Sequence, residues 1–210
     1  IFNEYDQCDL DASLPATLFY EQRGFKTVEH KKHELGDGEV MIYEIMEKKR
    51  PAKIERAERK DLEEILKLQY TAYQSEAQLF GGKKIPPLTQ TLKEVEEEYE
   101  KGIILKMTEE DGTIIGSVRA AEENGTVYVG KLMVHPDQQH KGYGKRLLLG
   151  IEKYFQEKQF ELFTSTRSAA NIRLYEKMGY EAFDTKAVDD ELEFVYFRKT
   201  DPDMGVNKKR

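Results

Sequence analysis

The chain has 210 residues, of which 39% are hydrophobic and 10% aromatic, and its formal net charge is −7. This composition can build a hydrophobic core and excludes wholesale disorder, while the acidic balance argues against nucleic-acid binding as the primary role. The single cysteine excludes a disulfide framework, and neither a membrane span nor a signal peptide is visible, so we expect a cytoplasmic protein without a membrane partner.

Residues 1–50 predict a short helix and a β-hairpin. The helical segment ends at Gly24, and the hairpin has strands at 26–35 and 39–47 around a glycine-rich turn. Residues 11–25 also repeat a later stretch, residues 167–180, at constant spacing. Four pairs carry the match: Ser13 with Ser168, Tyr20 with Tyr175, Glu21 with Glu176 and Gly24 with Gly179.

Elements follow in close succession from about residue 52. A short strand at 53–57 precedes a helix at 61–74 with apolar residues near helical period. Thr91 and Glu94 form a capping box that opens a second helix, for which Gly102 is the predicted stop signal. Strands at 103–108, 114–121 and 126–134 are then joined by the hairpin signals Asp111-Gly112 and Asn124-Gly125.

The remaining elements complete a mixed α/β pattern. A helix over 144–156 is predicted to point Leu147, Leu148, Ile151 and Tyr154 inward. A strand at 160–164, a helix at 170–178 stopped by Gly179, and strands at 180–184 and 192–198 follow. The order predicts a mixed sheet with helices on both faces.

A glycine-bearing turn between strand 126–134 and the next helix is the most informative motif. It reads Gln139-x-x-Gly142-x-Gly144. The free N–H groups of a helix N-terminus bind anions, and glycine lets a phosphate approach the backbone. A dinucleotide fingerprint would need Gly-x-Gly-x-x-Gly, and an ATP P-loop would need a hydroxyl where Arg146 stands. We therefore expect a different phosphate-bearing ligand.

Two motifs together resemble the GNAT superfamily of acyl-CoA-dependent N-acetyltransferases. They are Leu132-x-Val134-x-Pro136-x-x-Gln139-x-x-Gly142-x-Gly144, and the run from Asn171 to Tyr180. The resemblance covers residues 52–199. It implies the GNAT fold, a central, mostly antiparallel mixed sheet splayed between strands four and five, with a complete acetyltransferase domain over residues 51–200.

The resemblance also implies acetyl-CoA as co-substrate and no metal, and the four histidines show no metal-ligand spacing. The backbone of strand four would pair with the pantetheine arm, and the turn amides would hold the pyrophosphate, with added charge from two lysines. The residues so implied are Leu132, Met133, Val134, Gln139, His140, Lys141, Gly142, Tyr143, Gly144 and Lys145.

Tyr175 is implied as the general acid that protonates the leaving thiolate, because a phenol near its reference pKa of about 10 stays protonated. Many relatives carry Asn where this chain has Ser168 and a small residue where it has Asn171. Which of these two contacts the cofactor is left open. A backbone amide near Met133 or Val134 would stabilise the oxyanion. Glu76, Glu122 and Glu123 are candidate general bases by position alone.

Residues 1–50 resemble the C-terminal half of a second GNAT-like domain, and residues 201–210 are expected to fray. A half-domain cannot bury its own sheet face. Three origins stay open: a piece of a longer tandem protein, a hairpin swapped into another copy, as in a homodimer, or an extension of the chain's own sheet. Ala16 stands where the later copy has Asn171, so we expect no catalysis there.

The sequence thus predicts an N-acetyltransferase that moves the acetyl group directly from acetyl-CoA to a primary amine of a small molecule or peptide. The complete domain contains no cysteine, which suits direct transfer. A non-catalytic acyl-CoA-binding module that regulates or scaffolds is the alternative, and a domain binding ATP or NAD is a third hypothesis. The acceptor amine is not identified by any motif.

Overall fold

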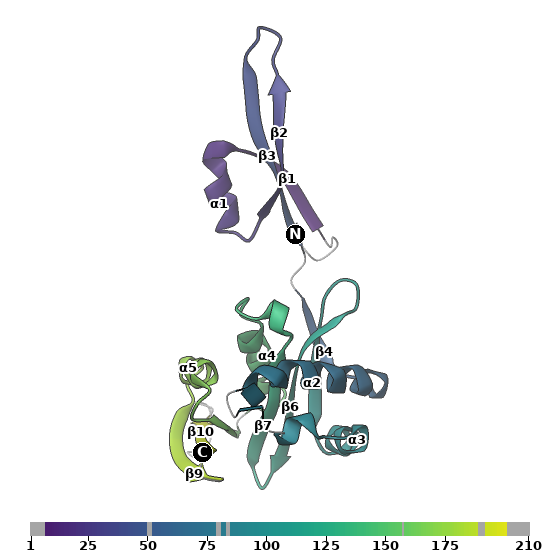
Figure 1. Cartoon of the computed structure of the whole chain (residues 1–210), viewed down its shortest axis with the longest axis vertical. Helices are drawn as coiled ribbons and strands as arrows, with labels where there is room; N and C mark the ends of the chain where they lie inside the picture. Colours follow the sequence, from purple (N-terminus) through teal and green to yellow (C-terminus); the bar gives the residue numbers. More distant parts are fainter. Residues whose placement is uncertain are drawn as a thin grey trace, which may run out of the picture. The chain divides into compact units, whose positions relative to one another are not determined.

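The computed structural model describes residues 7–49, 52–78, 81–82, 85–156, 158–188 and 192–200. The chain divides into two units, Ile1–Ala52 and Lys53–Arg210, which are described separately (Figure 1). The predicted tail at 201–210 lies outside the described residues.

The smaller unit is a three-stranded antiparallel sheet in the order β1-β3-β2, with one short helix. Its elements are β1 (Gln7–Ser13), a 3₁₀ turn (Leu14–Ala16), α1 (Thr17–Glu21), β2 (Lys26–Glu34) and β3 (Val40–Lys49). The long β2–β3 hairpin runs past the end of β1 (Figure 1). The buried core is small and consists of Ala12, Phe25 and Met46.

The larger unit is built on one mixed seven-stranded sheet in the order β4-β5-β6-β7-β8-β10-β9. Its strands are β4 (Lys53–Arg56), β5 (Ile103–Thr108), β6 (Ile114–Glu123), β7 (Thr126–Val134), β8 (Gln159–Ser165), β9 (Glu181–Ala187) and β10 (Glu193–Thr200). Its helices are α2 (Leu62–Gln78), α3 (Leu92–Lys101), α4 (Tyr143–Glu152) and α5 (Ala169–Lys177), with 3₁₀ turns at Arg59–Asp61, Pro86–Leu88 and Pro136–Gln138.

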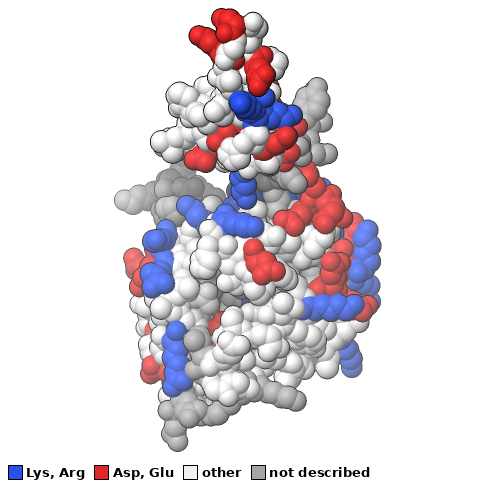
Figure 2. Space-filling view, turned by 45° about the horizontal axis from the view of Figure 1, so that its top comes forward, with Lys and Arg blue, Asp and Glu red and all other residues white. Residues whose placement is uncertain are grey.

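Helices cover both faces of this sheet, as the element order predicts. Neighbouring residues of a strand point to opposite faces. On β5, Ile104 packs in the cluster of α2, whereas Leu105 faces Gly150 of α4. Leu147, Leu148 and Ile151 of α4 are completely buried. The larger unit's face in Figure 2 carries its charged side chains mostly towards the edges, with uncharged residues between them.

Two details of the predicted helices are wrong. The helix after the glycine turn spans Tyr143–Glu152 rather than 144–156, and it passes into turns from Lys153 onward. Tyr154 lies beyond its end and is 47% exposed, so it does not point inward. By contrast, α2 continues to Gln78, about one turn further than predicted, which places Glu76 on the helix.

Gly102 ends α3 for a different reason from the predicted one. Its φ of −150° is extended backbone and does not require glycine. A Cβ at this position would lie 2.4 Å from the Ala120 carbonyl oxygen on the neighbouring strand. The residue is therefore fixed by close approach of two backbones.

We expect Gly102→Ala to lower the free energy of unfolding by about 1–3 kcal/mol, because the added methyl must push β5 and β6 apart. Gly130→Ala is the matched control, since a Cβ there meets nothing within 4 Å. Urea unfolding of both variants measures the difference. Equal stability of the two variants would contradict the proposed clash.

Candidate active site

The site begins where two parallel strands part. β7 pairs with β8 only at their first residues, where Thr126, Val127 and Tyr128 lie opposite Gln159, Phe160 and Glu161. Both strands continue beyond this point, β7 to Val134 and β8 to Ser165, without pairing with each other. Each stays paired on its other side, β7 with β6 and β8 with β10, so the backbone groups that face the gap are available to another partner.

A β-bulge on β7 marks the same point. Arg119 of β6 pairs with Gly130, but Ser117 pairs with Met133, so Lys131 and Leu132 together oppose Val118. Lys131 has a φ of 50°, in the left-handed region that a side chain other than glycine seldom adopts. Such bulges re-aim side chains next to functional sites.

The glycine turn presents the free N-terminus of α4. Gly142 has a φ of 78° and precedes the helix without a side-chain cap. The first intrahelical bond runs from Arg146 N–H to Gly142 O, at 3.1 Å, so the N–H groups at 142–145 precede the ladder. Gly144 lies against Leu174 of α5, which a Cβ would meet at 3.4 Å. A free helix N-terminus of this kind is able to bind an anion, and here it lies beside α5.

Two cavities lie along this opening and share part of their lining. One, of about 580 Å³, runs over the end of β7 and the turn and includes Gly142, Lys145 and Arg167. The other, of about 440 Å³, lies between β7, β8 and the segment at 85–87, and includes Tyr175. Four residues line both cavities: Tyr73, Glu76, Leu132 and Asn171.

Polar and phenolic side chains gather where the cavities meet. Ser168 donates its hydroxyl to Glu76 at 2.6 Å, linking α5 to α2. Asn171 donates to Thr164 of β8 at 3.3 Å. Tyr175 is 6% exposed and packs against Tyr180 and Phe197. Burial, and after it the nearby Glu76 carboxylate, raises the pKa of Tyr175, so this phenol keeps its proton.

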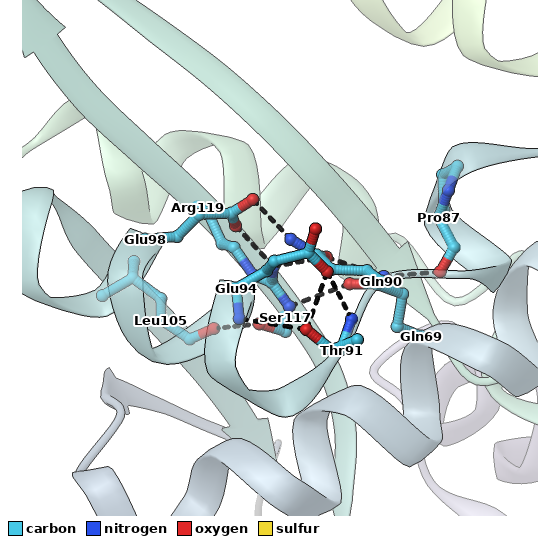
Figure 3. A network of polar contacts seen from close by, with 9 residues as sticks. All are labelled: Gln69, Pro87, Gln90, Thr91, Glu94, Glu98, Leu105, Ser117 and Arg119. Atoms are coloured by element: carbon cyan, nitrogen blue, oxygen red, sulfur yellow. Dashed lines mark hydrogen bonds and ion pairs between the residues drawn. The ribbon is translucent and has the colours of Figure 1, made fainter.

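A buried arginine fixes one wall of the smaller cavity (Figure 3). Arg119 of β6 donates to Gln69 of α2 at 2.8 Å, to Gln90 at 3.1 Å and to Glu98 of α3 at 2.5 Å. Gln69 also donates to the Pro87 carbonyl, at 2.7 Å. This network ties both helices and the segment between them to the sheet.

The structure brings most of the predicted site residues together. Leu132, Met133, Val134, Gln139, His140, Gly142, Tyr143, Gly144, Lys145, Ser168 and Asn171 line the larger cavity. Lys141 is not among its lining residues, and its ammonium bonds Gln138. The Gln139 amide donates to the Val134 carbonyl at 3.3 Å, so it braces the turn against β7.

The structure also separates the three candidate bases. Glu76 lines both cavities. Glu122 pairs with Lys158 at 2.7 Å and Glu123 lies at the exposed end of β6, and neither residue is part of the lining of these two cavities. Sequence reasoning missed Tyr73, Arg119, Lys131 and Arg167, whose places in the cavities depend on contacts between distant segments. Among these four residues, only Arg167 could have been found from the sequence, because it directly precedes Ser168.

The described part of the chain contains no group of three or more His, Cys, Asp or Glu side chains that could hold a metal ion. It also contains no helix with the length and apolar character needed to cross a membrane.

Comparison with known proteins gives a family match and many similar folds. The model of the acetyltransferase (GNAT) family matches residues 59–180, more than half of the chain. The UPF0157 protein YqkA of Bacillus subtilis is 26% identical over 123 residues, 58% of this chain and 35% of YqkA. The chain thus spans about a third of the length of this curated relative.

Three solved structures illustrate the likeness of fold. The ribosomal-protein-S18-alanine N-acetyltransferase from Escherichia coli has a TM-score of 0.59 at 17% identity, covering 71% of this chain and 93% of that one. The PaiA N-acetyltransferase from Thermoplasma acidophilum, in complex with coenzyme A, has a TM-score of 0.57 at 18% identity. This likeness covers 72% of this chain and 99% of that one. A phosphinothricin acetyltransferase from Sinorhizobium meliloti, in complex with acetyl-CoA, has a TM-score of 0.60 at 17% identity. This likeness covers 76% of this chain and 93% of that one.

We expect inorganic pyrophosphate to bind at the N-terminus of α4, and Gly142→Ala to weaken this binding by about 10-fold, which is 1.4 kcal/mol. The reason is that the turn must relax to relieve the left-handed φ, which misaligns the N–H groups. Isothermal titration calorimetry measures the affinity. Gly112→Ala, at a φ of 86° in a remote hairpin, is the matched control and should bind normally. An equal loss of pyrophosphate affinity in both variants would show that the turn at Gly142 does not form the binding site.

Proposed function

Because the chain belongs to the acetyltransferase (GNAT) family, we propose that it transfers an acetyl group from acetyl-CoA directly to a primary amine. The observation that carries this proposal is the meeting of two cavities. One has a free helix N-terminus with basic side chains, and the other has a buried phenol. A carboxylate, Glu76, lines both.

The larger cavity fits the phosphate end of acetyl-CoA. The N–H groups at 142–145 offer donors to the pyrophosphate, and Lys145 and Arg167 line the same cavity. From Leu132 to Val134, β7 pairs with β6 but not with β8, so its backbone groups on the β8 side are available to the pantetheine arm. Bound acetyl-CoA supplies a thioester that is activated for attack by an amine.

Glu76 is proposed as the general base. An ammonium must lose a proton before it can attack, and Glu76 lies where the acceptor cavity meets the cofactor cavity. The Ser168 hydroxyl holds one carboxylate oxygen, which leaves the other available. In this assignment Ser168 orients the base, and Asn171, which lines both cavities, contacts the cofactor arm.

Tyr175 is proposed as the general acid. Burial keeps its pKa raised and its hydroxyl protonated, so it can donate a proton to the departing thiolate. For the oxyanion, strand alternation favours the Val134 amide. His135 N–H donates to Ile115 of β6 at 2.8 Å, so the preceding N–H, on Val134, points away from β6 towards the parted β8.

We expect Tyr175→Phe to lower kcat by at least about 100-fold and to leave the Kd for CoA unchanged, because only the proton donor is lost. The phenyl ring keeps the contacts with Tyr180 and Phe197. Thiol release from acetyl-CoA over a panel of amines measures kcat, and calorimetry measures Kd. Tyr154→Phe, on a 47% exposed tyrosine outside both cavities, is the control and should be fully active.

Glu76→Gln tests the base in the same assay. Without the carboxylate, the amine must lose its proton to solvent, so the deficit should shrink as the pH rises towards the pKa of the amine. A pH-independent deficit would argue against the assignment. If CoA binds but no amine is acetylated, the chain is a non-catalytic acyl-CoA-binding module instead. Binding of ATP or NAD in place of CoA would reject both.

We also propose that the smaller unit is the C-terminal half of a second GNAT-like domain. Its strand order β1-β3-β2 corresponds to β8-β10-β9 of the larger unit. Gly24 N–H donates to Glu21 O at 2.9 Å, and Gly179 N–H donates to Glu176 O at 3.0 Å. Both helices thus end in the same way, with φ values of 84° and 82° at the two glycines.

The surface of the smaller unit supports this origin. Leu18, Phe19 and Ile42 are at least half exposed, although they are large and apolar. A half-domain without the other strands of its sheet leaves apolar side chains uncovered. The three origins given above would cover them with further strands of a tandem protein, with a second copy or with the chain's own sheet.

We expect residues 53–210, produced alone, to bind CoA within about 2-fold of the full chain, because all residues that line the two cavities lie in this segment. Calorimetry on both proteins measures the affinities. A large loss in the shorter protein would show that the smaller unit contributes to the site. Gel filtration of the two proteins then shows whether residues 1–52 cause self-association.

A further inference from the structure

The cavity proposed for the acceptor has a basic wall. Three basic side chains, Lys101, Arg119 and Lys131, and two acidic ones, Glu76 and Glu98, line it. Arg119 and Glu98 are already paired, at 2.5 Å. If Glu76 takes the proton of the amine, the charges of the cavity lining that remain unpaired are positive. They belong to Lys101 and Lys131.

Lys131 is the lysine best placed to meet a ligand. It is half-buried in the cavity wall, and it forms no ion pair with any carboxylate that the structure describes. Glu98, the acid that acts on it electrostatically, is held by Arg119 and also accepts from Gln90 at 2.6 Å. A half-buried ammonium without a counter-ion is unfavourable and attracts an anion.

The backbone at Lys131 and the neighbouring Arg119 side chain also indicate a ligand site at this wall. Lys131 has its left-handed φ at the bulge, and Arg119, opposite the adjacent Gly130, contributes to the same wall. Within the described residues, Arg119 Nε is the one buried side-chain polar atom that lacks a hydrogen-bond partner. Strain kept at a bulge beside an unused donor is typical of a binding site.

The rest of the cavity is apolar and aromatic. Phe163 of β8 and Tyr128 of β7 line it and are 53% and 48% exposed, which is unusual for large rings on central strands. Phe194 of β10 packs on Phe163 with ring centroids 4.9 Å apart. These rings provide a surface for an apolar group of a ligand.

We propose that the acceptor is a free amino acid with an apolar side chain, whose carboxylate binds Lys131 and whose side chain packs on Phe163, Tyr128 and Phe194. This inference rests on the proposed function, since it requires the amino group to reach Glu76. Burial, and to a lesser extent Arg119, lowers the pKa of Lys131, and a bound carboxylate would reverse that shift. A polyamine, with several positive charges, would meet Lys131 unfavourably.

The test compares three acceptors that share a phenethylamine skeleton and differ at the carboxylate, together with a polyamine. Phenylalanine, phenylalaninamide, phenethylamine and spermidine are assayed by thiol release from acetyl-CoA. We expect kcat/KM for phenylalanine to exceed that for phenethylamine by about 10- to 100-fold, the range for a hydrogen bond to a charged group. In Lys131→Met this preference should disappear through a loss on phenylalanine alone, and Lys131→Arg should restore part of it.

Two controls separate this inference from the proposed function. Lys93→Met removes an exposed lysine of α3 outside the cavity and should keep the wild-type preference. Calorimetric binding of phenylalanine to the CoA-loaded protein, with and without the Lys131→Met change, gives a readout that needs no turnover and should fall by the same factor.

Three outcomes would overturn the proposal. A wild-type preference for phenethylamine, phenylalaninamide or spermidine would reject it while leaving the acetyltransferase function intact. An equal loss on all acceptors in Lys131→Met would reject the role of Lys131. Absence of both CoA binding and acetylation would reject the proposed function together with this inference.

Discussion

The parting of β7 from β8 is the constraint on which the rest of the site depends. The two strands pair in parallel over three residues each and then separate, although both continue as strands. A paired sheet would have no backbone groups to offer and no room between these strands. The cavities on either side of Leu132 exist because the sheet is open at this place. The bulge at Lys131 lies on β7 beside the opening, and the turn at Gly142 follows the end of that strand and leads into α4.

An open sheet needs other contacts to keep its walls in place, and the Arg119 network provides them. Arg119 is 5% exposed, and its guanidinium bonds groups from α2, α3 and the segment between them. Removing one member of a buried ionic network leaves the others without partners, so such a network holds a single arrangement. On the other side, the Ser168–Glu76 bond links α5 to α2 across the junction of the cavities. The two helices that carry the proposed acid and base are thereby held in a fixed relation.

The glycines of the larger unit have different physical roles. Gly142 provides a left-handed turn before α4, and Gly144 allows α4 to approach Leu174 of α5. Gly102 permits the contact with the Ala120 carbonyl, and Gly116 lies where a Cβ would meet Leu147 at 2.9 Å. A glycine in a sequence therefore indicates a special position, but its φ and its neighbours decide whether shape or space is the reason. At Gly102 the sequence predicts the end of α3 correctly, but the reason is the space that the Ala120 carbonyl occupies and not a turn that requires glycine.

The sequence by itself determined the order of elements, the mixed sheet with helices on both faces, the capping box at Thr91 and the glycine turn, because these depend on local pattern, on turn chemistry and on motif. It also identified Tyr175 and the residues around Gly142 as the candidate site. Only the tertiary structure distinguished Glu76 from Glu122 and Glu123, and only it brought Arg119 and Lys131 into the acceptor wall. Those placements depend on which strands separate and on which helix faces which cavity. They arise from packing between distant segments, for which a single sequence carries no periodic signal.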